Sequence, residues 1–134
     1  MNIKKSIRSF RPAFKGIYET ILEGNNMKIQ ILAGIVAVAI SLLLHISKIE
    51  FIIILICIGL VLSAELFNTA LEHIVDKITN EHEEWARKTK DASAGAVLIL
   101  ALVALVIGII IWLPYLILYV DLLRLSLAFF MLNY

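Results

Sequence analysis

A row of polar side chains with helical spacing follows directly after an apolar run. The row consists of Glu65, Asn68 with its neighbour Thr69, Glu72 and Asp76. Because successive members are three or four residues apart, an α-helix would project them from one face over about three turns. Charges at the end of a membrane-spanning helix are costly unless something polar binds them. The position suits a reaction between a lipid-dissolved group and a water-soluble one.

Carboxylates with this spacing can bind Mg²⁺, which usually takes one or two protein carboxylates together with substrate phosphates. Lys90 and Asp91 begin the next apolar stretch, and a lysine there can neutralise phosphate charge. A metal, a cation and a carboxylate that deprotonates a hydroxyl are the parts of a phosphoryl transfer. The sequence contains neither GxxxxGK[ST] nor a kinase-type glycine loop, so a nucleotide would be bound without these motifs.

Two other interpretations of the acidic row stay open from the residues alone. The acids could face solvent or pair with the cations Arg87, Lys88 and Lys90, in a structural or assembly role. They could also line a path for protons or cations through the membrane. We expect no nucleic-acid partner.

The composition indicates a small membrane protein. The chain has 134 residues, of which 61% are hydrophobic, which is too apolar for an ordinary soluble domain. A spanning helix needs about 20 mostly apolar residues. We therefore expect one integral membrane domain, 1–134, of the all-α class, with spans at about 28–48, 51–72 and 92–113. The second helix should continue to about Ile78.

The segment before the first span has the pattern of a helix lying in the membrane surface. Apolar residues recur there at spacings of three and four beside a basic stripe. We expect this amphipathic helix over residues 3–23, in two pieces, because Pro12 lacks an amide hydrogen. No cleavable signal peptide is expected. The basic residues place the N-terminus and the second loop in the cytoplasm.

The rest of the chain gives weaker signals. Residues 81–90 are expected to form a short charged connector, and the small residues of 92–96 should let two helices approach closely. Pro114 should end or kink the third span. The tail 114–134 is apolar but carries charges, and its placement stays open. The single cysteine, Cys57, excludes a disulfide framework within the chain.

Two segments together resemble the prokaryotic diacylglycerol kinase family, which includes the undecaprenol kinases. They are 64–76, AELFNTALEHIVD, and 90–98, KDASAGAVL. The shared pattern is Glu-x-x-Asn-[Ser/Thr]-Ala-x-Glu-x-x-x-Asp, followed by Lys-Asp and a span that begins with small residues. The resemblance extends more weakly to Ser9 and reaches about Leu113. It implies a homotrimer of three-span subunits in the bacterial inner membrane, with active sites shared between neighbours.

The resemblance also implies a function: Mg²⁺-dependent transfer of the ATP γ-phosphate to the hydroxyl of a membrane lipid, diacylglycerol or undecaprenol, at the cytoplasmic face. Glu65 would be the catalytic base and Glu72 a ligand of the metal on ATP. Asn68 and Asp76 would organise the site. The nucleotide-binding residues would be Lys90 and Asp91, together with the connector residues Glu81, His82 and Glu83.

One position departs from the family pattern. The family usually has a second metal-binding glutamate before the first span, and the position that aligns with it here is Gly24. Glu23 is adjacent, but one helix position is a rotation of about 100°. Glu23 can therefore replace the missing glutamate only if the backbone bends, which Gly24 permits.

Overall fold

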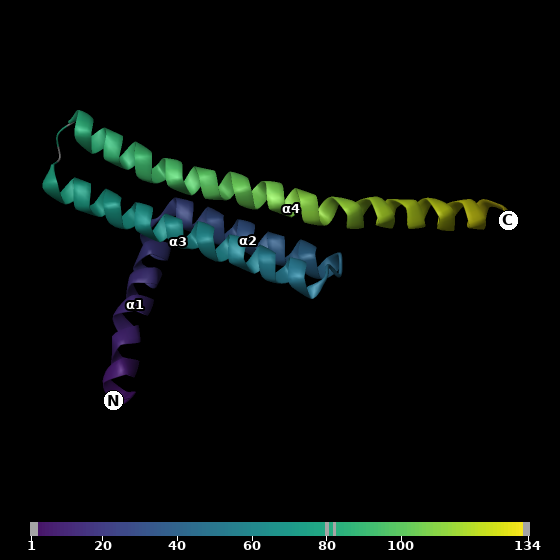
Figure 1. Cartoon of the computed structure of the whole chain (residues 1–134), viewed down its shortest axis with the longest axis horizontal. Coiled ribbons are helices and arrows are strands. Elements are labelled where there is room, and N and C mark those ends of the chain that lie inside the picture. Colours follow the sequence, from purple (N-terminus) through teal and green to yellow (C-terminus); the bar gives the residue numbers. More distant parts are fainter. Residues whose placement is uncertain (1–2, 80, 82, 133–134) are drawn as a thin grey trace.

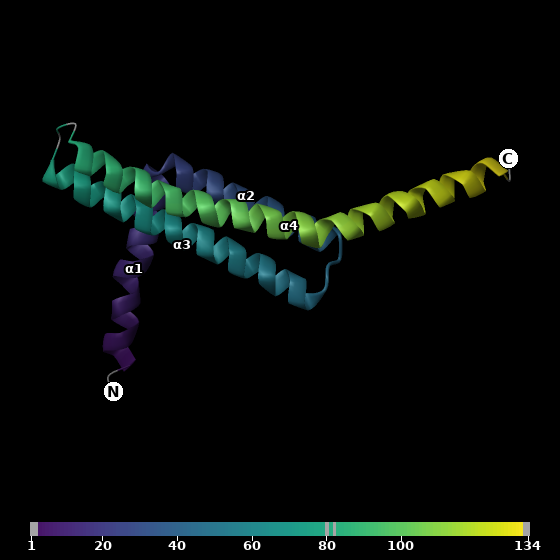
Figure 2. The same ribbon diagram turned by 45° about the horizontal axis from the view of Figure 1, so that its top comes forward.

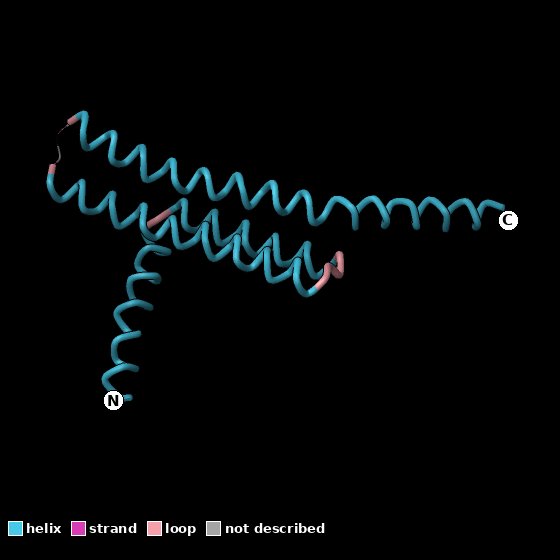
Figure 3. The backbone as a smooth tube through the Cα atoms, in the orientation of Figure 1, coloured by secondary structure: helices cyan, strands magenta, loops and turns pink. Residues whose placement is uncertain are grey.

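The chain forms a helical hairpin, α3 and α4, with a third helix, α2, packed beside it. A computed structural model describes residues 3–79, 81 and 83–132. The helices are α1 (Ile3–Glu23), α2 (Asn25–Leu43), α3 (Lys48–Ile78) and α4 (Glu84–Leu132). Figure 1 shows α2, α3 and α4 running alongside one another, while α1 leaves them at a steep angle. The described part contains helices and connecting loops but no strand (Figure 3).

Helices α2, α3 and α4 are each long and apolar enough to cross a membrane. This confirms the predicted all-α class and the three apolar spans. The membrane-surface position of α1 and the homotrimer stay predictions. The second helix does continue to Ile78, as expected.

The helices meet through few buried side chains, and much apolar surface stays exposed. The buried apolar side chains include Met27 of α2 and Ile54, Val61 and Val75 of α3. Gly34 lets α2 approach α3 closely, because a Cβ there would lie 3.1 Å from Ile58 Cγ2. Exposed apolar side chains are what a lipid-facing surface requires.

At the end of the bundle farther from the α3–α4 connector, polar contacts join all three spanning helices. Ser47 and Glu50 form a capping box at the start of α3, and the Tyr115 hydroxyl donates to Glu50 Oε2 at 2.7 Å. Trp112 Nε1 donates to the buried Ser41 Oγ at 3.1 Å. The α2–α3 turn is thereby tied to α4.

Both prolines lie inside helices. The prediction of two pieces around Pro12 was wrong, since α1 is one helix over Ile3–Glu23. A proline removes one backbone hydrogen bond, and in an exposed helix water can bind the freed carbonyl. Likewise α4 does not end at Pro114 but continues to Leu132. It does change direction between its green and yellow parts (Figure 2).

The charged connector is shorter than residues 81–90, because α4 already begins at Glu84. Intrahelical ion pairs support this polar first part. Lys88 Nζ lies 2.7 Å from Glu84 Oε1, and Arg87 Nη1 lies 2.6 Å from Asp91 Oδ2, each four residues apart. Such pairs favour helix over loop.

Candidate functional site

The predicted acidic row lies on one face of α3 and changes from buried to exposed along the helix. Glu65 and Asn68 are only 3% and 4% exposed. Glu72 is half-buried and Asp76 is exposed. The row thus connects the apolar interior to the polar end of the hairpin, as its sequence position predicted.

The carboxylate of Glu65 lies at a cavity of about 210 Å³ between α2, α3 and α4. Asn26 and Gln30 line it from α2, Asn68 lines it from α3, and apolar side chains, including Leu98, line it from α4. Among the described residues, no hydrogen bond or ion pair engages the Glu65 side chain. Since no fully buried side-chain oxygen among the described residues lacks a partner, the Glu65 carboxylate opens onto this cavity, where a ligand can reach it.

Asn68 connects the acidic row to α4. Its Nδ2 donates to Glu72 Oε1 at 3.1 Å, and its Oδ1 accepts from Ser93 Oγ at 2.6 Å. The same hydroxyl lies 2.9 Å from the carbonyl oxygen of Lys90. Because the Glu72 carboxylate can only accept, it fixes the Asn68 amide with Nδ2 toward Glu72, and this leaves Oδ1 facing the Ser93 hydroxyl. The amide in turn holds Glu72.

The small residues expected to allow close helix contact contribute unequally. Ser93 makes the contact with α3 directly, and Val97, one turn later, is buried. A Cβ at Gly95 would meet nothing within 4 Å. The close approach of α3 and α4 therefore does not depend on Gly95.

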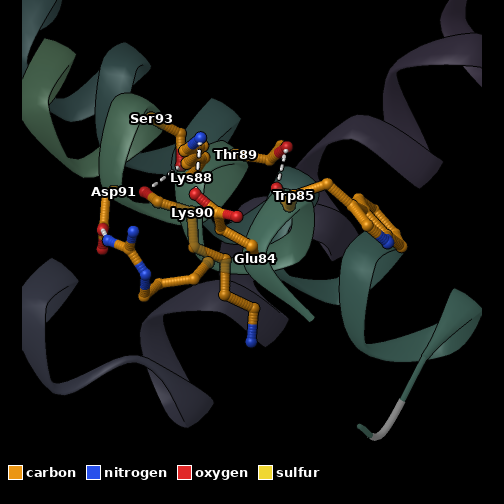
Figure 4. Close-up of polar contacts among 8 residues, drawn as sticks. Glu84, Trp85, Lys88, Thr89, Lys90, Asp91 and Ser93 are labelled. Carbon is orange, nitrogen blue, oxygen red and sulfur yellow. Dashed lines mark hydrogen bonds and ion pairs between the residues drawn. The ribbon is translucent and has the colours of Figure 1, made fainter. Parts of the chain in front are cut away.

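Lys90 forms an ion pair with Asp76 across the α3–α4 hairpin. This places the predicted lysine beside the acidic row, as its sequence position indicated. Asp91, which is labelled in Figure 4, instead forms an ion pair with Arg87 on its own helix. Lys88 pairs with Glu84 rather than with the row, so among the three nearby cations only Lys90 pairs with a member of the row.

A second, polar cleft of about 490 Å³ lies at the connector end of the hairpin. Its polar lining comes from Asp76, Thr79, Glu81, Glu83, Glu84, Arg87 and Lys90. The volume is in the range of small-molecule sites. Two of the three predicted connector residues, Glu81 and Glu83, are in this lining, whereas His82 lies outside the described residues.

The backbone bends at Gly24. Helix α1 ends at Glu23, Gly24 is extended with φ −88° and ψ 114°, and α2 starts at Asn25. The bend places Glu23 against α3, where its Oε2 lies 3.8 Å from His73 Nε2. His73 is the neighbour of Glu72 in the chain. The backbone therefore bends, as a replacement of the missing glutamate by Glu23 requires, and the contact that Glu23 makes is to His73 and not to a member of the acidic row.

The donor set fits a magnesium ion that keeps waters and substrate ligands, but not a closed protein cage. Within the described ranges, no three His, Cys, Asp or Glu side chains are grouped so that they could hold a metal. Glu72 keeps one carboxylate oxygen outside its hydrogen bond with Asn68. Mg²⁺ commonly binds one or two carboxylates and completes its shell with water and phosphate oxygens.

Sequence reasoning missed the roles of Ser93 and His73. Ser93 was grouped with small packing residues, but its place three positions after Lys90 was a usable signal, because this spacing puts both on one helix face. The contact of His73 with Glu23 depends on the bend at Gly24. No spacing along the chain predicts that contact.

Comparison with known proteins identifies the family of this chain. Residues 11–112 match the family "Prokaryotic diacylglycerol kinase". An undecaprenol kinase from Bacillus subtilis is 40% identical over 112 residues, which are 84% of this chain and 91% of that protein. A diacylglycerol kinase from Synechocystis is 35% identical, over 79% of this chain and 61% of that protein. The Escherichia coli diacylglycerol kinase is 32% identical over 60% of this chain and 62% of its own. The chain therefore belongs to the prokaryotic diacylglycerol kinase family.

Proposed function

We propose that this protein is a membrane lipid kinase that transfers the γ-phosphate of ATP, with Mg²⁺, to the hydroxyl of a lipid at the cytoplasmic face. The observation that carries the proposal is the unpaired, buried Glu65. It lies at a cavity lined by both polar and apolar side chains, and a polar row leads from it to a charged cleft. Lipid hydroxyl and nucleotide phosphate can meet along that row.

The lipid would approach Glu65 through apolar surroundings. A further cavity of about 340 Å³ between the three spanning helices shares Gln30 and Ala101 with the Glu65 cavity. The rest of its lining is almost entirely apolar and extends to Trp112. An aliphatic chain fits such a lining, with the hydroxyl toward Glu65.

The nucleotide would occupy the polar cleft at the ends of α3 and α4. The cleft lining contains four carboxylates and the cations Arg87 and Lys90. Such a lining repels a bare polyphosphate, so the bound species should carry a divalent cation. Glu72, together with Glu23, would hold that cation. When bound, Mg²⁺ neutralises phosphate charge and aligns the transferred group.

The chain's own residues then supply positioning and proton transfer. Lys90 leaves its ion pair with Asp76 and binds a phosphate oxygen. Asn68 and Asp76 organise the site. Asp91 contributes to nucleotide binding. Glu65 takes the proton as the lipid oxygen forms its bond to the γ-phosphorus. The bond from that phosphorus to the β–γ bridging oxygen breaks, and ADP leaves with its electron pair.

Undecaprenol is the first lipid to test, because the Bacillus subtilis undecaprenol kinase aligns with this chain over most of both proteins. Diacylglycerol is the second. We further propose a homotrimer in the bacterial inner membrane, with the N-terminus and the α3–α4 connector in the cytoplasm. The broad apolar surface of a single chain supports contact with lipid and with other copies.

The test is phosphate transfer from radiolabelled ATP to each lipid, offered separately in bilayers, with Mg²⁺ and with a chelator. Glu65→Gln is the active-site variant. Glu19→Gln is the matched control, because Glu19 is an exposed carboxylate on α1 that pairs with Lys15. Labelling should require Mg²⁺, persist in the control and disappear in Glu65→Gln. Cation flux without labelling would instead favour the transport interpretation.

A further inference from the structure

Helix α4 continues well beyond the other helices. Figures 1 and 2 show its yellow part extending past the ends of α2 and α3. Every described side chain from 116 to 129, and also Met131, is exposed. This segment lies outside residues 11–112, which match the family. Its role therefore needs its own explanation.

The segment begins beside Tyr115, which is hydrogen-bonded to the α2–α3 turn, and beside Pro114, which lacks one helical hydrogen bond. The Tyr115 hydroxyl donates to Glu50 Oε2 at 2.7 Å and accepts from the Ser47 amide at 3.3 Å. Pro114, the residue before it, cannot donate to the carbonyl of Ile110 four positions earlier. The α2–α3 turn thus holds the chain at Tyr115, and the missing hydrogen bond makes bending easiest one residue away.

The length of α4 is too great for one straight crossing. Its 49 residues would measure about 73 Å at 1.5 Å per residue, whereas the hydrocarbon core is about 30 Å thick. The polar first turns occupy the connector end. If α4 were straight, the part after residue 113 would extend about 28 Å beyond the membrane into water. A return crossing needs a turn, and the helix has none up to Leu132.

The side chains of this segment match lipid rather than water. Large apolar residues occur on nearly all sides of it: Leu116, Ile117, Leu118, Val120, Leu122, Leu123, Leu125 and Leu127 are all exposed. A bundle of copies in water would bury one stripe and leave the rest wet, whereas a helix that is apolar all round is solvated by lipid. The charges Asp121 and Arg124 occupy one narrow sector and lie 3.8 Å apart.

We propose that residues 116–132 bend at Pro114 and lie in the outer interface of the bilayer as an in-plane membrane anchor. The apolar sides enter the acyl-chain region, and the Asp121–Arg124 pair faces the headgroups, where a neutral pair costs little. The partner of this surface is the lipid of the outer leaflet. The proposal depends on the three spans and on the cytoplasmic position proposed above for the α3–α4 connector, but not on kinase activity.

The test places a fluorophore at single cysteines in the full-length protein, in a Cys57→Ala background, reconstituted in phosphatidylcholine and phosphatidylglycerol vesicles. Leu123→Cys and Asp121→Cys form the matched pair, because they lie about 200° apart on the helix. Leu127→Cys is a second reporter on the Leu123 side. Quenching is measured with nitroxide-labelled lipids and with aqueous iodide. Ile109→Cys and Lys77→Cys are the lipid-facing and water-facing controls.

At Leu123 and Leu127 we expect quenching by nitroxide lipids and loss of iodide quenching, as at Ile109. At Asp121 we expect the reverse, as at Lys77. Iodide quenching at all three tail positions would overturn the proposal in favour of a helix extending into water. Protection from both quenchers at Leu123 and Leu127 would overturn it in favour of contact between copies.

Discussion

Removing the Ser93 hydroxyl tests whether a positioning contact across α3 and α4 controls the acidic row. Ser93→Ala takes away the donor that lies 2.6 Å from Asn68 Oδ1. Asn68 is 4% exposed, so water replaces that donor poorly. A buried acceptor left without its partner costs about 1–3 kcal/mol. Turning the amide over offers no relief, because its oxygen would then face the Glu72 carboxylate.

The lost free energy should lower the rate of phosphate transfer more than it lowers the stability of the folded protein. If about 1.4–2.7 kcal/mol of it is expressed in the transition state, kcat/KM falls about 10- to 100-fold. Because Asn68 holds Glu72, the Mg²⁺ concentration for half-maximal rate should rise as well. Ser93→Thr, which keeps the hydroxyl, should recover most of the activity. Ser126→Ala, the same change on the exposed tail, should behave as wild type.

The assay is initial-rate kinetics with varied ATP and Mg²⁺ in bilayers, alongside thermal unfolding in detergent. Wild-type kcat/KM and an unchanged Mg²⁺ titration in Ser93→Ala would refute the positioning role of the Ser93 hydroxyl. A lowered Tm with unchanged kinetics would leave Ser93 as a packing residue only.

Four further variants test other contacts. Glu72→Gln should weaken Mg²⁺ dependence most strongly and Glu23→Gln to an intermediate degree; an unchanged Mg²⁺ titration in either variant would remove that residue as a ligand. Gly24→Glu should lower activity rather than raise it, because a Cβ there would lie 2.9 Å from a backbone oxygen; increased kcat would contradict this, and kinetics with a melting curve decide it. Tyr115→Phe should cost about 1 kcal/mol of stability by removing the hydrogen bond to Glu50, with kcat unchanged; a wild-type Tm would show that the contact does not hold the α2–α3 turn.

The helices of this protein were predictable because their signals are local and strong. Apolar runs long enough to span a membrane predicted α2, α3 and α4, and the spacing of the polar residues placed Glu65 through Asp76 on one face. Pro12 was misleading because α1 is one helix, whereas at Pro114 the helix continues and α4 changes direction between its green and yellow parts (Figure 2). A proline disfavours a helix at one position, but the hydrogen bonds on both sides of Pro12 and Pro114 sustain it.

The candidate site was predictable in its residue types but not in its partners. The burial of Glu65 follows from its place at the end of an apolar run. The contact of Ser93 with Asn68 depends on the register between α3 and α4, and the position of Glu23 beside His73 depends on the extended backbone of Gly24. The spacing of Ser93 from Lys90 indicates a shared face of α4, but no spacing along the chain gives the partner of either residue, so three-dimensional structure was needed for both.

The central claim is that Glu65 acts on a lipid hydroxyl from a buried cavity. The most direct measurement is Mg²⁺-dependent transfer of radiolabelled phosphate from ATP to undecaprenol or diacylglycerol by wild-type, Glu65→Gln and Glu19→Gln proteins in bilayers. We predict labelling of one of the lipids by the wild type and the Glu19→Gln control, and a loss of several orders of magnitude in Glu65→Gln without loss of fold. Equal labelling by Glu65→Gln, or no labelling by a well-folded wild type, would contradict the claim.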